Sequence, residues 1–151
     1  MGARSLRKDK RRMGRAIALA RLNHGLTGDN PSVGCVIVDA MGHVVGEGVT
    51  GLGGRPHAEE IALEEAGNHA RGGTAYVTLE PCRERTSGGA SCSQKLIEAQ
   101  IFRVVCATRD PHPTAKEGLA RLKTAKIALT IGIRKPAADR LYQSFFDVIK
   151  L

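Results

Sequence analysis

The sequence predicts a three-layer α/β/α sandwich built around a five-stranded mixed sheet. Short runs of β-branched residues alternate with segments of helical periodicity along most of the chain. Only a short turn separates the first two runs, which is typical of an antiparallel hairpin, whereas a helix separates each later pair. Because strands joined through a helix form right-handed parallel crossovers, the last three strands should be parallel.

Strands are expected at residues 33–38, 44–49, 74–79, 104–107 and 127–131. The first is an unbroken β-branched run and should be buried on both faces. Residues 39–42 form the turn of the hairpin.

Helices are expected at residues 9–23, 57–72, 92–100, 115–124 and 136–149. The second shows the 3.6-residue period through Ala58, Ile61 and Ala62. Ser91 is a suitable N-cap for the third helix, and Pro136 lies in the first turn of the last one, where proline is favoured.

The length of 151 residues is sufficient for one domain that buries its own core. We therefore expect residues 1–151 to form one domain, with a basic arm at about residues 1–12. No run approaches the ~20 apolar residues of a membrane span, and no signal-peptide h-region follows Met1. We expect a cytoplasmic protein without membrane contact.

The formal net charge is +8, and the N-terminal segment carries much of it through Arg4, Arg7, Lys8, Lys10, Arg11, Arg12 and Arg15. A basic patch can bind nucleic acid, but an aromatic content of 3% leaves few rings on which bases could stack. We interpret the arm as a frayed, solvated lead into a helix and do not expect a nucleic-acid partner. An organellar transit peptide is the alternative, since the segment is rich in Arg and poor in acids.

The four cysteines fall into two pairs of different character. Cys35 and Cys106 lie inside apolar runs, where a cysteine is usually a small buried hydrophobe. Cys82 and Cys92 flank a polar, Gly-rich loop instead. Without a signal peptide the thiols should be reduced, and only Cys82 and Cys92 are candidate metal ligands.

Together with Cys82 and Cys92, His57 completes a set of three N/S ligands. Catalytic zinc takes three such protein ligands and leaves a fourth position for water. Glu59, two residues after His57, remains as a proton carrier, as in the H-x-E signature of zinc deaminases. His57 and Glu59 fall at one predicted helix start and Cys92 at another. The positive end of a helix dipole stabilises anions and favours the thiolate of Cys92 that binds metal. A purely structural zinc site is the alternative, but such sites usually have four ligands and short C-x₂₋₄-C spacing.

These residues lie in a sequence that resembles the cytidine deaminase superfamily and, more narrowly, the deaminase domains of bifunctional riboflavin biosynthesis proteins. The resemblance covers most of the chain after the basic arm. The matching segments are residues 30–38, 45–48, 56–59 (Pro-His-Ala-Glu), 74–82 (ending Glu-Pro-Cys), 96–99, 103–105 and 110–113.

The resemblance implies that His57, Cys82 and Cys92 bind Zn²⁺, that Glu59 shuttles protons and that Asn30 lines the substrate pocket. It implies hydrolytic removal of an exocyclic amine from a small molecule, a phosphoribosyl diaminopyrimidine. It also implies a homodimer or higher homo-oligomer, and a separate reductase in the same pathway, because the family's C-terminal reductase domain is absent here.

The loop between the two cysteines differs from the family pattern, although it retains Arg85 and Thr86 as candidate substrate contacts. It lacks the His and Pro-Pro residues with which the family holds the ribose phosphate, so Arg85 either grips a phosphate or is simply solvated. Three alternatives therefore stay open: a deaminase of another base, nucleoside or heterocycle, an RNA-editing or nucleic-acid-binding protein, and an inactive zinc-fold partner. The long Cys-Cys loop argues against the second, and the retained Glu59 against the third.

Overall fold

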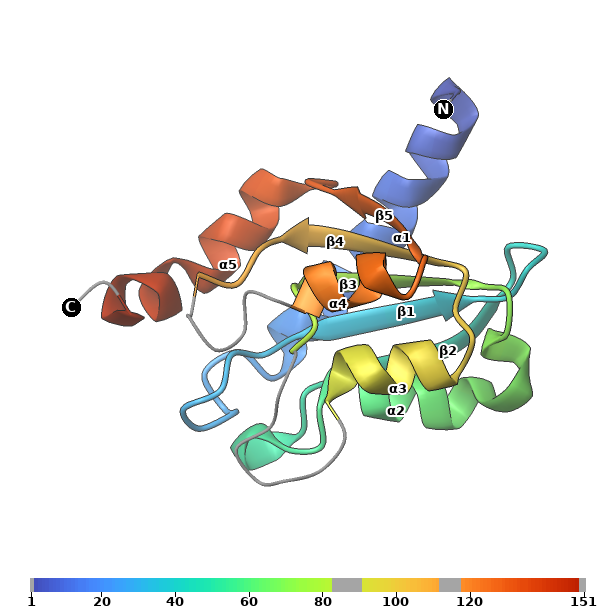
Figure 1. The fold of residues 1–151 in the computed structure, drawn as a ribbon. Helices are drawn as coiled ribbons and strands as arrows, with labels where there is room; N and C mark the ends of the chain where they lie inside the picture. Colours follow the sequence, from blue (N-terminus) through green and yellow to red (C-terminus); the bar gives the residue numbers. More distant parts are fainter. Residues whose placement is uncertain (1, 83–90, 112–117, 150–151) are drawn as a thin grey trace.

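The computed structural model describes residues 2–82, 91–111 and 118–149, with side chains described as far as residue 147. Its centre is one five-stranded sheet of order β2-β1-β3-β4-β5 (Figure 1). The strands are β1 Gly34–Val38, β2 Val44–Val49, β3 Thr74–Leu79, β4 Arg103–Thr108 and β5 Ala128–Ile131. β1 pairs antiparallel with β2 and β3, and β3, β4 and β5 are parallel. The predicted hairpin and parallel crossovers are confirmed.

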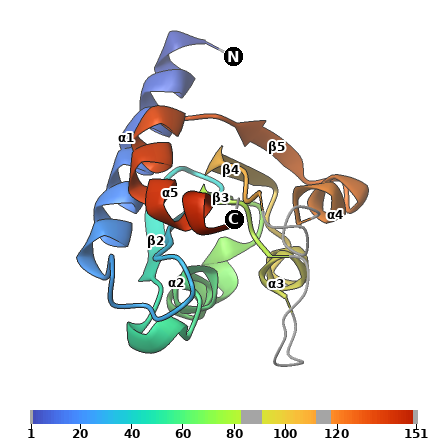
Figure 2. The same ribbon diagram turned by 90° about the vertical axis from the view of Figure 1, so that its left-hand side faces the viewer.

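Helices cover both faces of the sheet, which confirms the predicted three-layer sandwich. The α-helices are α1 Ala3–Leu22, α2 Ala58–Ala66, α3 Cys92–Glu98, α4 Gly118–Thr124 and α5 Lys135–Ile149, with short 3₁₀ turns η1 Leu52–Gly54 and η2 Gly67–Ala70. Figure 2 shows α1 and α5 on one face, and α2, α3 and α4 on the other. α2 is shorter than predicted, because Gly67 at φ 55° ends it and only the 3₁₀ turn continues.

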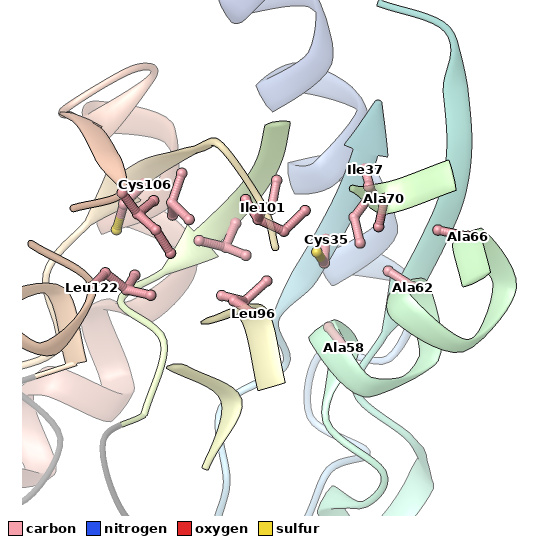
Figure 3. Close-up of a cluster of buried hydrophobic side chains, with 14 of the residues drawn as sticks. Cys35, Ile37, Ala58, Ala62, Ala66, Ala70, Leu96, Ile101, Cys106 and Leu122 are labelled. Carbon is pink, nitrogen blue, oxygen red and sulfur yellow. The ribbon is translucent and has the colours of Figure 1, made fainter. Parts of the chain in front are cut away.

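Two apolar clusters join these layers. Figure 3 shows part of the cluster under α2, α3 and α4, where Ala62, Leu96 and Leu122 meet Cys35 and Cys106 of the sheet. The opposite cluster packs α1 and α5 on the other side of the same strands. All five residues of β1 are buried, as the unbroken apolar run predicted. Cys35 and Cys106 are fully buried, in agreement with their interpretation as small core residues.

Two glycines in β2 let α2 lie directly on the sheet. A Cβ atom at Gly46 would lie 2.2 Å from the carbonyl oxygen of Ala62, and a Cβ atom at Gly48 would lie 2.2 Å from that of Ala58. Both distances are far below van der Waals contact, so any side chain at these positions would push α2 outwards. The small β2 residues therefore determine the depth at which the first turn of α2 is held.

The N-terminal segment differs from the predicted frayed arm at residues 1–12. Residues 3–12 belong to α1, which runs without interruption to Leu22. Arg and Lys are good helix formers, and Asp9 fastens this part of the helix to the sheet. Asp9 is 2% exposed and accepts hydrogen bonds from Arg103 Nη2 (2.7 Å) and Tyr76 Oη (2.8 Å). The flanking side chains of Arg4, Arg7, Lys8, Lys10 and Arg11 are exposed, as expected.

Replacing Asp9 with Ala should destabilise the fold, because the largely buried Arg103 guanidinium would lose the carboxylate that neutralises its charge. Breaking a buried ion pair costs about 3–5 kcal/mol, and we expect a value near the lower end because Arg103 keeps some contact with water. Urea unfolding monitored by circular dichroism measures the change. Arg15→Gln, which removes an exposed ion pair from the same helix, is the matched control and should have a much smaller effect. Equal stability of the Asp9 variant and the wild type would contradict this role.

Candidate metal centre

Three side chains with metal-binding atoms meet at one end of the sheet. His57 is the N-cap of α2, Cys82 follows β3, and Cys92 is the first residue of α3. Figure 1 shows the beginnings of α2 and α3 at the end of the sheet where β2 and β3 end. His57 Nδ1 lies 3.2 Å from Cys92 Sγ, and one ligand atom from each residue lies within 4.8 Å of the other two. In the described part of the chain, this is the one cluster of three such residues that could hold an ion.

The donor set and its dimensions fit a zinc ion. Tetrahedral zinc with bonds of about 2.0–2.3 Å holds its ligand atoms roughly 3.3–3.8 Å apart, which is within the spread of these three atoms. The backbone helps to place the sulfurs, because the Cys92 N–H donates to Cys82 Sγ (3.2 Å) and the Ser93 N–H donates to the Cys82 carbonyl (3.1 Å). The predicted cap of α3 is confirmed, since Ser91 Oγ accepts from the Gln94 N–H. Three ligands leave the fourth tetrahedral position open.

The two thiols have opposite acidities when no cation lies between them. Hydrogen bonds from the Cys92 thiol and from His57 lower the pKa of Cys82 to about 4 despite its partial burial. The neighbouring Cys82 thiolate and burial raise the pKa of Cys92 above its usual range. One thiolate therefore forms readily and prevents the second from forming beside it. A divalent cation would remove this conflict, because it neutralises both sulfurs.

Glu59 lies next to this cluster in the first turn of α2. Its side chain is buried, at 4% exposure, although it is a carboxyl group. Burial and the nearby Cys82 charge raise the pKa of Glu59 to about 7. A carboxyl group with a pKa close to neutrality can both accept and return a proton, which is what general acid–base catalysis requires.

Asn30, the candidate substrate contact, lies in the loop between α1 and β1. Its side-chain amide donates to the Gly54 carbonyl (3.1 Å), and in the same loop the Leu26 carbonyl accepts from the Gly53 N–H (2.9 Å). These bonds join the loop to the segment that leads into His57. Arg85 and Thr86 lie outside the described residues, so their predicted roles stay predictions.

Sequence reasoning missed two carboxylates that support the site. Glu80 is buried at the end of β3, and it accepts hydrogen bonds from the backbone N–H groups of Asp110 (3.3 Å) and Leu119 (3.2 Å). It thereby joins the segment before Cys82 to the end of β4 and to α4. Glu60 binds the backbone of His57. A carboxylate at the end of an apolar strand, as in Leu79-Glu80-Pro81, is the sequence signal that could have identified the first.

Comparison with known proteins places this cluster in a family context. The family model described as the cytidine and deoxycytidylate deaminase zinc-binding region matches residues 6–108. The riboflavin biosynthesis protein RibD of Haemophilus influenzae is 44% identical over 136 residues, which are 88% of this chain and 36% of that protein. A diaminohydroxyphosphoribosylamino-pyrimidine deaminase of Buchnera aphidicola (from Schizaphis graminum) is 38% identical over 140 residues, which cover 92% of this chain and 94% of that protein.

The fold agrees with these relatives. The crystal structure of a diaminohydroxyphosphoribosylaminopyrimidine deaminase/5-amino-6-(5-phosphoribosylamino)uracil reductase from Thermotoga maritima superposes with a TM-score of 0.90 at 32% identity. The match covers 97% of this chain and 42% of that chain, so this chain corresponds in length to less than half of the two-activity protein. The matched family region contains His57, Glu59, Cys82 and Cys92. The chain therefore belongs to the cytidine and deoxycytidylate deaminase family.

Proposed function

We propose that this chain is a zinc-dependent hydrolytic deaminase of the diaminopyrimidine ribotide of riboflavin biosynthesis. One observation carries the chemistry: His57, Cys82 and Cys92 converge beside the buried carboxyl group of Glu59. The substrate is proposed from the relatives, among which the full-length match in Buchnera carries the name of this deaminase.

The roles of the residues follow from their chemistry. His57 Nδ1 and the two sulfurs would hold the zinc ion, which when bound lowers the pKa of a water molecule. A Glu59 carboxylate oxygen would accept the proton from that water and deliver it to the ring nitrogen of the substrate. Once the water oxygen has bonded to the amine-bearing carbon, Glu59 would take the second proton of that water and pass it to the amine. The C–N bond would then break and ammonia leave, so one residue serves several proton transfers. The Asn30 side chain would contribute to the substrate pocket.

The identity of the substrate can be tested through the phosphate group of the ribotide. An arginine can hold a phosphate through paired charge-assisted hydrogen bonds, so Arg85→Ala should raise KM for the ribotide and leave zinc content unchanged. The assay measures ammonia release from the ribotide, from its dephosphorylated form, and from common bases and nucleosides. Equal turnover with and without the phosphate, unaffected by Arg85→Ala, would remove the ribotide from the proposal and leave the deaminase chemistry intact.

A deaminase of another base, nucleoside or related heterocycle is the second candidate. The sequence of residues 83–91 favours it, because this segment lacks the His and Pro-Pro residues that the deaminase domains of bifunctional riboflavin biosynthesis proteins carry there. Preference for an unphosphorylated substrate in the same assay would select this candidate.

Assembly and cellular context are part of the same proposal. We expect a homodimer or higher homo-oligomer, and a reductase activity that consumes the product, since the Thermotoga relative is named for both a deaminase and a reductase. Sedimentation at micromolar concentration tests the assembly, and a monomer would contradict it. No helix among residues 2–82, 91–111 and 118–149 is long and apolar enough to cross a bilayer, and we propose a cytoplasmic location.

A further inference from the structure

Glu60 lies between the two helix starts that carry His57 and Cys92. It is the third residue of α2, and its Oε1 atom accepts a hydrogen bond from the His57 N–H at 3.1 Å. Its Oε2 atom accepts from Lys95 Nζ of α3 at 2.8 Å. Lys95 lies one turn after Cys92, and its own N–H donates to the Ser91 carbonyl at 3.0 Å. A single carboxylate thus connects the backbone at one metal-binding residue to the helix that begins with another.

This connection is partly shielded from solvent. The side chains of Glu60 and Lys95 are 18% and 31% exposed, and α2 packs against α3. An ion pair in such a position is less screened than one on the open surface. Both carboxylate oxygens are engaged, which restricts the rotamer of Glu60 and the distance between the two helix starts.

The charge of Lys95 also suits its position. Glu60 adds a negative charge to a region that already holds two cysteine sulfurs and Glu59, and negative charges close together repel. The ammonium group in contact with Glu60 offsets the charge of this carboxylate. The pair can therefore cap His57 without adding a net negative charge beside the sulfurs.

We propose that the Glu60–Lys95 pair is a positioning device that sets the separation of His57 and Cys92 and thereby increases metal affinity. The inference rests on the proposed function, because it requires that these residues bind zinc. Groups that orient metal ligands from outside the ligand set typically contribute 10–100-fold to metal affinity. Glu60 does not contact the metal in this role. It acts through the His57 backbone and through α3.

The experiment measures zinc affinity by competition with a chromophoric chelator in the full-length chain. Glu60→Ala removes both bonds and should weaken zinc binding by about 10–100-fold. Glu60→Gln keeps an oxygen for the His57 N–H. Lys95→Met removes the ammonium group and its hydrogen bond to Oε2 but leaves the bond between Glu60 and His57, so each variant should show a smaller loss. If the two groups act as one unit, the double variant Glu60→Gln/Lys95→Met should bind zinc no more weakly than the weaker single variant.

Controls separate positioning from general damage. Lys135→Met removes an ion pair of similar length from α5, on the opposite face of the sheet, and should leave zinc affinity unchanged. Lys95→Arg retains the charge and should restore most of the affinity lost in Lys95→Met. The Co²⁺-substituted Glu60→Ala variant should show shifted d–d bands, because the geometry of the ligands changes, whereas Lys135→Met should not.

Two outcomes would overturn the inference in distinguishable ways. A wild-type chain that binds zinc, together with Glu60→Ala and Lys95→Met variants whose affinities lie within twofold of it, removes the positioning role alone. A wild-type chain without zinc affinity removes the proposed function and this inference with it.

Discussion

Glu59→Gln is expected to lower the turnover of the deaminase by about 10²–10⁴-fold, the usual contribution of general acid–base catalysis. We expect the upper end, because the same carboxylate serves several proton transfers in the proposed reaction. Gln is similar in size to Glu, so the buried site should keep its shape. Turnover falls because the Gln amide cannot accept a proton at neutral pH. Single-turnover ammonia release, measured on protein with its zinc content determined, gives the result.

The metal provides the control for this variant. Glu59 is not among the three proposed ligands, so Glu59→Gln should retain one zinc per chain. Because Gln cannot become negatively charged in a buried position, the variant should be at least as stable as the wild type. Retained activity with zinc bound would assign proton transfer to another group, and loss of zinc would instead give Glu59 a structural role at the metal.

Cys82→Ala is expected to abolish stoichiometric zinc binding and, with it, activity. The substitution leaves two of the three proposed protein ligands, and it also removes the sulfur that accepts a hydrogen bond from the Cys92 N–H. Metal-bound loops are often ordered by the metal itself, so the segments around the site should become more susceptible to proteolysis. Elemental analysis of the purified variant measures the loss, and limited proteolysis with and without added zinc reports the effect on the loops.

Cys106→Ala is the matched control, because Cys106 is a buried thiol that lies in β4 and is not one of the three clustered residues. It should retain zinc, although a small cavity would lower the free energy of unfolding. Full zinc occupancy in Cys82→Ala would show that Cys82 is not a ligand. Loss of zinc in both variants would indicate that the fold as a whole was damaged.

The sequence determined the first hairpin and the parallel half of the sheet, because the signals for them are local, whereas the antiparallel pairing of β1 with β3 came only from the structure. The β-branched runs, the short turn at residues 39–42 and the helical periods between later strands each depend on a few neighbouring residues. Combined with the handedness of crossovers, they predict the antiparallel β1–β2 hairpin and the parallel β3–β4–β5 arrangement that the structure has. The ends of α1 and α2 were less predictable, since Asp9 and Gly67 act there through a distant contact and a backbone conformation.

In the candidate site too, local sequence predicted some features and tertiary packing decided the others. Residue type and spacing selected His57, Glu59, Cys82 and Cys92, because few side chains bind zinc or carry protons. Only the tertiary structure decided how they are supported. The contacts of Glu60 with Lys95 and of Glu80 with Leu119 join residues that are 35 and 39 positions apart. The residues next to a carboxylate on a helix or at a strand end do not predict which distant residue it will contact. These contacts arise only when packing, with Gly46 and Gly48 admitting α2 to the sheet, brings the segments together.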